Sequence, residues 1–135
     1  MHRSGHAPRW SDPVLLTILL PCRDEADTVA DCVRDACAVL TRLGVEGEVL
    51  VVDNGSTDGS GVLARAAGAR VVDAPDPGYG SALNTGITHA RGRFTIMADC
   101  DGSYDLGAAD ALLARLLAGD DLVVGDRFAG GIAPG

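Results

Sequence analysis

The hydrophobic and polar positions along the chain form short apolar runs separated by amphipathic stretches. Residues 14–20 make a continuous apolar run, which is typical of a strand buried on both faces of a parallel sheet, and Pro21 is expected to close it. Similar shorter runs predict further strands, over residues 49–52, 69–72, 93–98 and 121–124.

Between these runs, apolar residues recur at the spacing of one helix face. The clearest stripe predicts a helix over 26–43, ended by Gly44. Shorter helices are predicted over 58–67 and 80–90, and a leucine stripe between 106 and 117 predicts another. Asp24 or Glu25 is expected near the positive end of the first helix, and Ser56 or Thr57 as the cap of the second.

The five alternations of strand and helix predict an α/β fold, with parallel strands joined by right-handed crossovers. Ligands of such sheets bind beyond the carboxyl ends of the strands, where the strand order reverses. Three of the predicted strands are followed at this edge by polar residues, namely 23–25, 53–54, and Asp99 with Asp101. Their recurrence at one edge favours a single site over three independent helix caps.

Length, net charge and cysteine spacing exclude several classes of function for this chain. With 135 residues the chain holds one domain at most, over 14–135, after a polar lead-in at 1–13. Its net charge is −8 and all its basic residues are arginines, which argues against nucleic acid or a broad anionic membrane surface as a partner. The four cysteines lack CxxC spacing, which favours reduced structural thiols and a cytoplasmic setting. We find no membrane-spanning run and no signal-peptide pattern.

The acidic pair Asp99 and Asp101 is the strongest candidate for chemistry. In an extended chain residues i and i+2 point to the same side, and two adjacent carboxylates raise each other's pKa unless a cation lies between them. Hard oxygen ligands suit Mg²⁺ or Mn²⁺, which often bridge to substrate phosphates. The alternative is a polar turn whose aspartates cap the next helix.

Two other functions are disfavoured by what the chain lacks. A strand followed by DxDGS also occurs in haloacid-dehalogenase-like phosphatases, but these need a downstream lysine and this chain has none. A dinucleotide-binding loop is weak, because Gly78 and Gly80 follow two prolines instead of the first strand, and Leu83 occupies the third glycine position.

Five segments in a fixed order carry a more specific signal: LLPCRDEADTV, VLVVDNGSTDGS, PGYGSALNTGITHARG, MADCDGSYD and VVGDRFAGGIAPG. Together they resemble the motifs of the family 2 glycosyltransferases of the GT-A fold, in particular bacterial relatives of the dolichyl-phosphate mannose and glucose synthases. The resemblance extends from Leu16 to Gly135. It departs from the common pattern at Asp24, where Asn is common, and at Asn54, where a second Asp is frequent.

The resemblance implies a Rossmann-like nucleotide-diphospho-sugar transferase fold and a role for each matching residue. Pro21 and Glu25 would lie near the nucleotide base, and Asp53 would recognise the base and ribose region. Asp101 would be the main ligand of Mg²⁺ or Mn²⁺, and Asp99 would contact the metal or the sugar–ribose side. Arg127 is expected to meet an acceptor phosphate, the alternative being an ion pair with Asp126 or Asp105.

The implied reaction moves a hexose from a UDP- or GDP-linked donor to a polyprenyl or dolichyl phosphate. We find no clear general base, and a phosphate acceptor that is already ionised needs none. The setting is expected to be cytoplasmic, with peripheral association at the inner face of the membrane or through a membrane-associated partner. The family's catalytic domain continues beyond the last motif, so we expect a donor-side fragment. The alternative is a non-catalytic nucleotide-binding remnant or interaction module.

Overall fold

A computed structural model describes residues 14–98, 114–115, 123–124 and 131–132. Its elements in chain order are β1 (Val14–Cys22), α1 (Val29–Leu43), β2 (Gly47–Asp53), α2 (Ser60–Ala67), β3 (Arg70–Asp73), α3 (Tyr79–His89), β4 (Gly92–Met97), β5 (Val123–Val124) and β6 (Gly131–Ile132). The helix predicted between 106 and 117 lies outside the described residues, except for residues 114–115, which are helical.

The strands form one sheet in the order β3-β2-β1-β4-β5-β6. Every neighbouring pair is parallel except β5 with β6, which is antiparallel. The predicted parallel sheet is therefore confirmed, whereas the short antiparallel β6 was not predicted. Because β1 lies between β2 and β4, the strand order reverses at β1, and the carboxyl ends of β1 and β4 form the switch point where ligands bind in such sheets.

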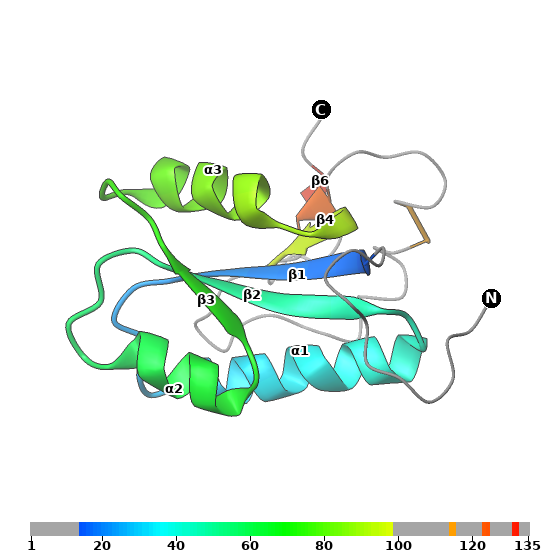
Figure 1. Cartoon of the computed structure of the whole chain (residues 1–135), viewed down its shortest axis with the longest axis horizontal. Coiled ribbons are helices and arrows are strands. Elements are labelled where there is room, and N and C mark those ends of the chain that lie inside the picture. Colours follow the sequence, from blue (N-terminus) through cyan, green and yellow to red (C-terminus); the bar gives the residue numbers. More distant parts are fainter. Residues whose placement is uncertain (1–13, 99–113, 116–122, 125–130, 133–135) are drawn as a thin grey trace.

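Helices cover both faces of this sheet (Figure 1), with α1 and α2 on one side and α3 on the other. Alternate residues of β1 pack into the two hydrophobic cores on opposite faces of the sheet. Leu16, Ile18 and Leu20 belong to the core under α1, and Leu19 belongs to the core under α3. All four side chains are at most 2% exposed. Burial on both faces explains why β1 reads as a continuous apolar run instead of an alternating one.

Pro21 does not close β1, contrary to the expectation from the sequence. The strand continues to Cys22, and Pro21 pairs in register with Val52 of β2. Backbone groups alternate in direction along a strand, and the amide of Ala98 bonds to the carbonyl of Leu19 on the β4 side. The missing N–H of Pro21 faces that same side, beyond the end of β4, so the proline removes no bond from the β1–β2 ladder.

Both early helices begin later than predicted. Helix α1 starts at Val29 instead of residue 26, and α2 starts at Ser60 instead of residue 58, after Gly59 in the left-handed conformation. Ser56 and Thr57 do not cap α2, because their polar groups bond to the loop after β1. Tertiary contacts between loops therefore override the local helix signals. None of the helices in the described ranges has the length and apolar character needed to cross a bilayer.

Candidate functional site

The carboxyl ends of three strands lie side by side at one edge of the sheet. The amide of Asn54 donates to the carbonyl of Cys22 at 2.8 Å, and the amide of Ala74 donates to the carbonyl of Asp53 at 3.0 Å. These bonds extend the pairing of β1, β2 and β3 past their last ladder positions. The loops that carry Glu25 and Asp53 are thus neighbours, as predicted from the strand ends.

A reciprocal pair of hydrogen bonds joins the loop after β1 to the loop after β2. The amide of Asp24 donates to Ser56 Oγ at 2.9 Å, and the amide of Thr57 donates to Asp24 Oδ1 at 2.8 Å. Asp24 adopts a positive φ of 51°, a region that aspartate tolerates better than most residues. The Asp24 carboxylate therefore links the two loops and does not sit at the amino end of α1, where the sequence had placed it as an alternative to Glu25.

Asp58 and Ser60 supply a second link between the same loops. The amide of Glu25 donates to Ser60 Oγ at 2.9 Å, and the amide of Ala26 donates to Asp58 Oδ2 at 3.0 Å. The hydroxyl and amide of Ser60 both donate to Asp58 Oδ1. The Ser60 hydroxyl, followed by backbone amides, lowers the pKa of Asp58 below its ordinary value. Neither residue was singled out from the sequence, although a DxS spacing before a helix is a known local turn pattern.

The structure describes three of the six predicted site residues. Pro21 and Glu25 are partly buried on the loop side of β1, and Glu25 Oε2 lies 3.5 Å from the Thr28 hydroxyl. Asp53, at the end of β2, accepts from the amide of Ser56 at 2.9 Å and is also partly buried. Asp99, Asp101 and Arg127 lie outside the described residues, so their roles stay predictions.

Asn54 is a polar residue of this edge for which no role was predicted. Only 7% of its surface is exposed. Its side-chain amide donates to the carbonyl of Gly78 at 2.9 Å, its oxygen accepts from the amide of Gly78 at 3.1 Å, and a longer contact of 3.4 Å reaches the carbonyl of Asp76. A cavity of about 190 Å³ lies beside this contact, lined in part by Arg23, Asn54 and Asp76.

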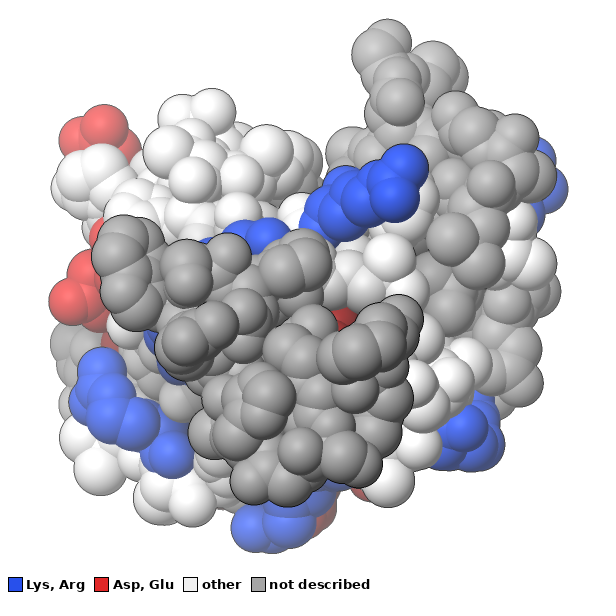
Figure 2. Space-filling view, turned by 45° about the vertical axis from the view of Figure 1, so that its right-hand side comes forward, with Lys and Arg blue, Asp and Glu red and all other residues white. Residues whose placement is uncertain are grey.

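The described loops of the carboxyl edge carry an excess of acidic side chains: Asp24, Glu25, Asp27, Asp53, Asp58, Asp73 and Asp76, against Arg23. On the face seen in Figure 2, basic side chains occur at separate places and form no continuous patch among the described residues. The described ranges contain no group of three or more His, Cys, Asp or Glu placed to hold a metal ion. Asp99 and Asp101, the predicted metal ligands, lie outside these ranges.

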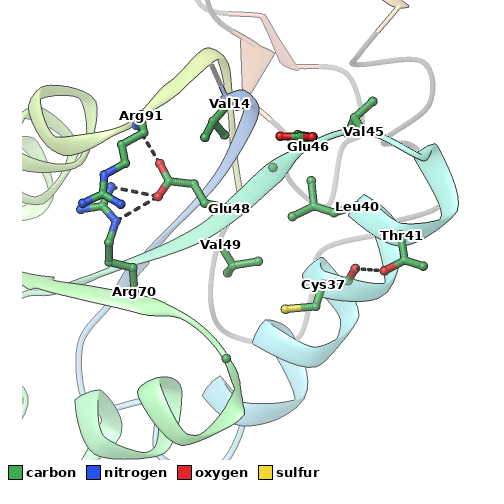
Figure 3. A pocket seen from close by; sticks show the side chains of 12 residues that line it. Val14, Cys37, Leu40, Thr41, Val45, Glu46, Glu48, Val49, Arg70 and Arg91 are labelled. Carbon is green, nitrogen blue, oxygen red and sulfur yellow. Dashed lines mark hydrogen bonds and ion pairs between the residues drawn. The ribbon is translucent and has the colours of Figure 1, made fainter. Parts of the chain in front are cut away.

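The amino ends of the strands hold a larger cavity of about 570 Å³ (Figure 3). Glu48 lies beside it, bonded to three partners: its carboxylate accepts from the Thr17 hydroxyl and the Arg91 amide at 2.7 Å each and from Arg70 Nε at 2.9 Å. Burial alone would raise the pKa of Glu48, but these hydrogen bonds outweigh it and lower the pKa below its ordinary value. This cluster joins β1, β2, β3 and the start of β4.

Comparison with known sequences gives a family match over most of the chain. Residues 17–135 match the model of the family described as "Glycosyl transferase family 2". The chain is 40% identical over 112 residues to an uncharacterized glycosyltransferase of Mycobacterium tuberculosis, which covers 83% of the chain and 48% of the relative. It is 40% identical over 118 residues to the glycosyltransferase AglJ of Haloferax volcanii, covering 87% and 37%.

A dolichyl-phosphate hexose transferase of Haloferax volcanii is 34% identical over 84 residues, covering 62% of the chain and 36% of that relative. The chain thus spans about half the length, or less, of these curated relatives.

Solved structures share the fold. Glucosyl-3-phosphoglycerate synthase from Mycobacterium tuberculosis, in complex with Mn²⁺, UDP-glucose and phosphoglyceric acid, matches with a TM-score of 0.66 and 25% identity, over 85% of the chain and 46% of that protein. The same enzyme has been crystallised with Mg²⁺ and UDP, and that structure matches with a TM-score of 0.63. A crystal structure of a mycobacterial protein matches with a TM-score of 0.69 and 29% identity, over 82% and 39%. The α/β GT-A fold class expected from the sequence is confirmed.

Proposed function

Because the chain belongs to glycosyl transferase family 2, we propose that it is the donor-binding part of an enzyme that transfers a hexose from a nucleoside diphosphate to an acceptor. The observation that carries the proposal is the carboxyl edge of the sheet, where hydrogen-bonded loops hold Glu25 and Asp53 next to the switch point between β1 and β4. Loops already held in place bind a ligand with less loss of conformational freedom.

Asp53 and Glu25 are proposed to accept hydrogen bonds from the nucleotide, with Pro21 beside the base. A carboxylate can accept several hydrogen bonds, so the bond from the Ser56 amide leaves Asp53 able to accept another from a base N–H or a ribose hydroxyl. Both carboxylates are partly exposed at the edge, where a ligand can reach them. UDP is the first donor nucleotide to test, because a family relative binds UDP-glucose; GDP is the second.

The acidic character of this edge fits a requirement for a divalent cation. A diphosphate would be repelled by the carboxylates around Arg23 unless positive charge came with it. Asp99 and Asp101 would hold Mg²⁺ or Mn²⁺, and the metal would offset the negative charge that develops on the departing nucleoside diphosphate. Both aspartates follow Ala98, whose amide is bonded to Leu19 of β1 at the switch point.

The acceptor is proposed to be a polyprenyl phosphate, with Arg127 binding its phosphate. A dolichyl-phosphate hexose transferase among the relatives supports this choice. A phosphoglycerate acceptor, as in the synthase crystallised with phosphoglyceric acid, is the competing phosphorylated class. A lipid acceptor would bring the protein to the inner face of the membrane from a cytoplasmic setting.

The test separates donor binding from transfer. Calorimetry with UDP or GDP in the presence of Mn²⁺ should show binding that is lost on chelation and in Asp101→Ala, with the unfolding transition of that variant unchanged. Incubation with labelled UDP-glucose and polyprenyl phosphate or phosphoglycerate should identify the acceptor class. Metal-dependent binding without transfer to either acceptor would favour the non-catalytic nucleotide-binding module. Absence of nucleotide binding would contradict both functions.

A further inference from the structure

We propose that Asn54 is a positioning residue that shapes the nucleotide site by clipping the loop between β3 and α3 to the end of β2; this inference rests on the proposed function. The loop comprises residues 74–78 and leads directly into α3 at Tyr79. Asn54 and Gly78 are separated by 24 positions in the sequence. Their hydrogen bonds join the residue after β2 to the residue before α3.

The clip uses both halves of the side-chain amide. The Nδ2 group donates to the carbonyl of Gly78, and Oδ1 accepts from the amide of the same glycine. This two-point contact fixes the position and orientation of one peptide segment, as a single bond would not. Asparagine supplies a donor and an acceptor, whereas an ionised aspartate supplies acceptors only.

The surroundings of the clip make it effective. Only 7% of the surface of Asn54 is exposed, so its hydrogen bonds are shielded from competing water. Its own amide is bound to the carbonyl of Cys22, which anchors it to β1. Gly78 has a φ of 109°, a conformation that glycine adopts readily and residues with a Cβ rarely do, so glycine at this position allows the loop to take the shape that Asn54 holds.

The cavity of about 190 Å³ is lined by Asn54 together with Arg23, Gly55 and residues 74–77. Its wall on the β3 side is the clipped loop. Asp53, the proposed nucleotide contact, directly precedes Asn54 in the chain. Releasing the loop would open this wall, and a bound nucleotide would then have to order the loop again, at a cost in affinity.

The experiment compares Asn54→Asp and Asn54→Ala with the unmodified chain. The aspartate keeps the acceptor for the Gly78 amide and loses the donor to the Gly78 carbonyl, whereas alanine loses both. We expect UDP or GDP, with Mn²⁺, to bind at least roughly tenfold more weakly to both variants, because each loses the buried bond to the Gly78 carbonyl. Ala38→Asp, on the exposed face of α1, adds the same charge and should bind as the unmodified chain does.

Hydrogen exchange of the loop supplies a second readout at the amides of Ala74, Asp76 and Gly78, because Pro75 and Pro77 carry no amide hydrogen. In the unmodified chain these amides should be about equally protected with and without nucleotide. In both variants they should exchange faster without nucleotide and regain protection when nucleotide is bound, and this recovery is what a purely structural role would not produce.

Equal affinity of the variants and the unmodified chain, or unchanged exchange of the loop, would overturn the proposal. If the unmodified chain binds no nucleotide, the proposed function fails, and the exchange of the free chain still decides whether the clip exists. If Asn54→Asp does not fold, Asn54→Ser, which is smaller and uncharged, takes its place. Failure of all three variants to fold would make Asn54 a folding residue and would also contradict the proposal.

Discussion

The two ends of the sheet both hold carboxylates, but they use them differently. At the amino ends, Glu48 accepts from a hydroxyl, a guanidinium and an amide, and 14% of its side chain is exposed. At the carboxyl ends, Asp24 and Asp58 accept from backbone amides of the neighbouring loop, Asp53 accepts from an amide of its own loop, and all three are partly or fully exposed. The first arrangement neutralises a buried charge and joins strands; the second arranges loops and leaves acidic oxygens facing solvent.

An acidic residue at a strand end is therefore not by itself a sign of function. A carboxylate whose acceptor capacity is filled by an arginine, a hydroxyl and an amide has little capacity left for a ligand. A carboxylate held from one side by loop amides keeps that capacity. The contrast predicts that substitutions at the amino edge change stability, and that substitutions at the carboxyl edge change ligand binding.

The largest expected effect on stability is that of Glu48→Ala. Arg70 and Thr17 would lose their shared acceptor, and the free energy of unfolding should fall by about 2–3 kcal/mol, less than for a fully buried pair because 27% of the Arg70 side chain is exposed. Denaturant unfolding measures this loss. Asp31→Ala, which breaks the exposed pair with Arg34, should cost at most about 0.5 kcal/mol. Similar losses in the two variants would contradict the stabilising role assigned to the Glu48 cluster.

The second effect is the pH dependence that Glu48 confers. Its pKa is lowered in the folded state, so the unfolded chain binds its proton more readily and the stabilisation is present above the ordinary carboxyl pKa of about 4. That stabilisation should be lost as the pH falls below this value through the lower folded pKa. Glu48→Gln should lose less stability over the same pH range. Parallel stability curves for the two proteins would contradict the assignment.

At the carboxyl edge, Ser60→Ala should lower stability by about 1 kcal/mol, since it removes the acceptor of the Glu25 amide and a donor to Asp58. Because the same bonds hold the loop that carries Glu25, we expect nucleotide affinity to fall in calorimetry as well. Thr41→Ala removes a hydroxyl that bonds within α1, far from this edge, and serves as the control. A loss of affinity in both variants would mean that the effect is not local.

The smallest effect concerns the Cys37 thiol, which lines the cavity at the amino edge. Burial raises its pKa, so a smaller fraction is thiolate, and alkylation by iodoacetamide near pH 8 should be slower than that of a free cysteine. Mass spectrometry of the Cys37 peptide follows the reaction. Faster alkylation than the free amino acid would show that the edge is more open than its lining residues indicate.

Sequence patterns predicted the first four strands and the three helices between them within a few residues, because apolar runs and helical stripes report burial directly. They failed where contacts between loops decide the outcome. Pro21 was expected to end β1, yet the strand continues, because the missing donor faces the side where β4 has already ended. Ser56 and Thr57 were expected to cap α2, yet they bond to Asp24.

The residues of the candidate site also fall into a group that was predicted from the sequence and a group that was not. Glu25 and Asp53 were predicted from strand ends and from family resemblance, and the structure brings their loops together. The parts played by Asn54, Asp58 and Ser60 were not predicted, because each depends on a partner far along the chain or on another loop. Asp99, Asp101 and Arg127 remain predictions from the sequence.

The amino-acid sequence alone determined the order of strands and helices, the parallel sheet and the family, because periodic burial and ordered motifs are properties of the chain itself. Tertiary structure alone decided which polar groups hold the loops together and which carboxylate has its acceptor positions occupied by hydrogen-bond donors. A hydrogen bond needs two groups within about 3 Å. For Asn54 with Gly78 and for Glu48 with Arg70, only the folded sheet creates that proximity.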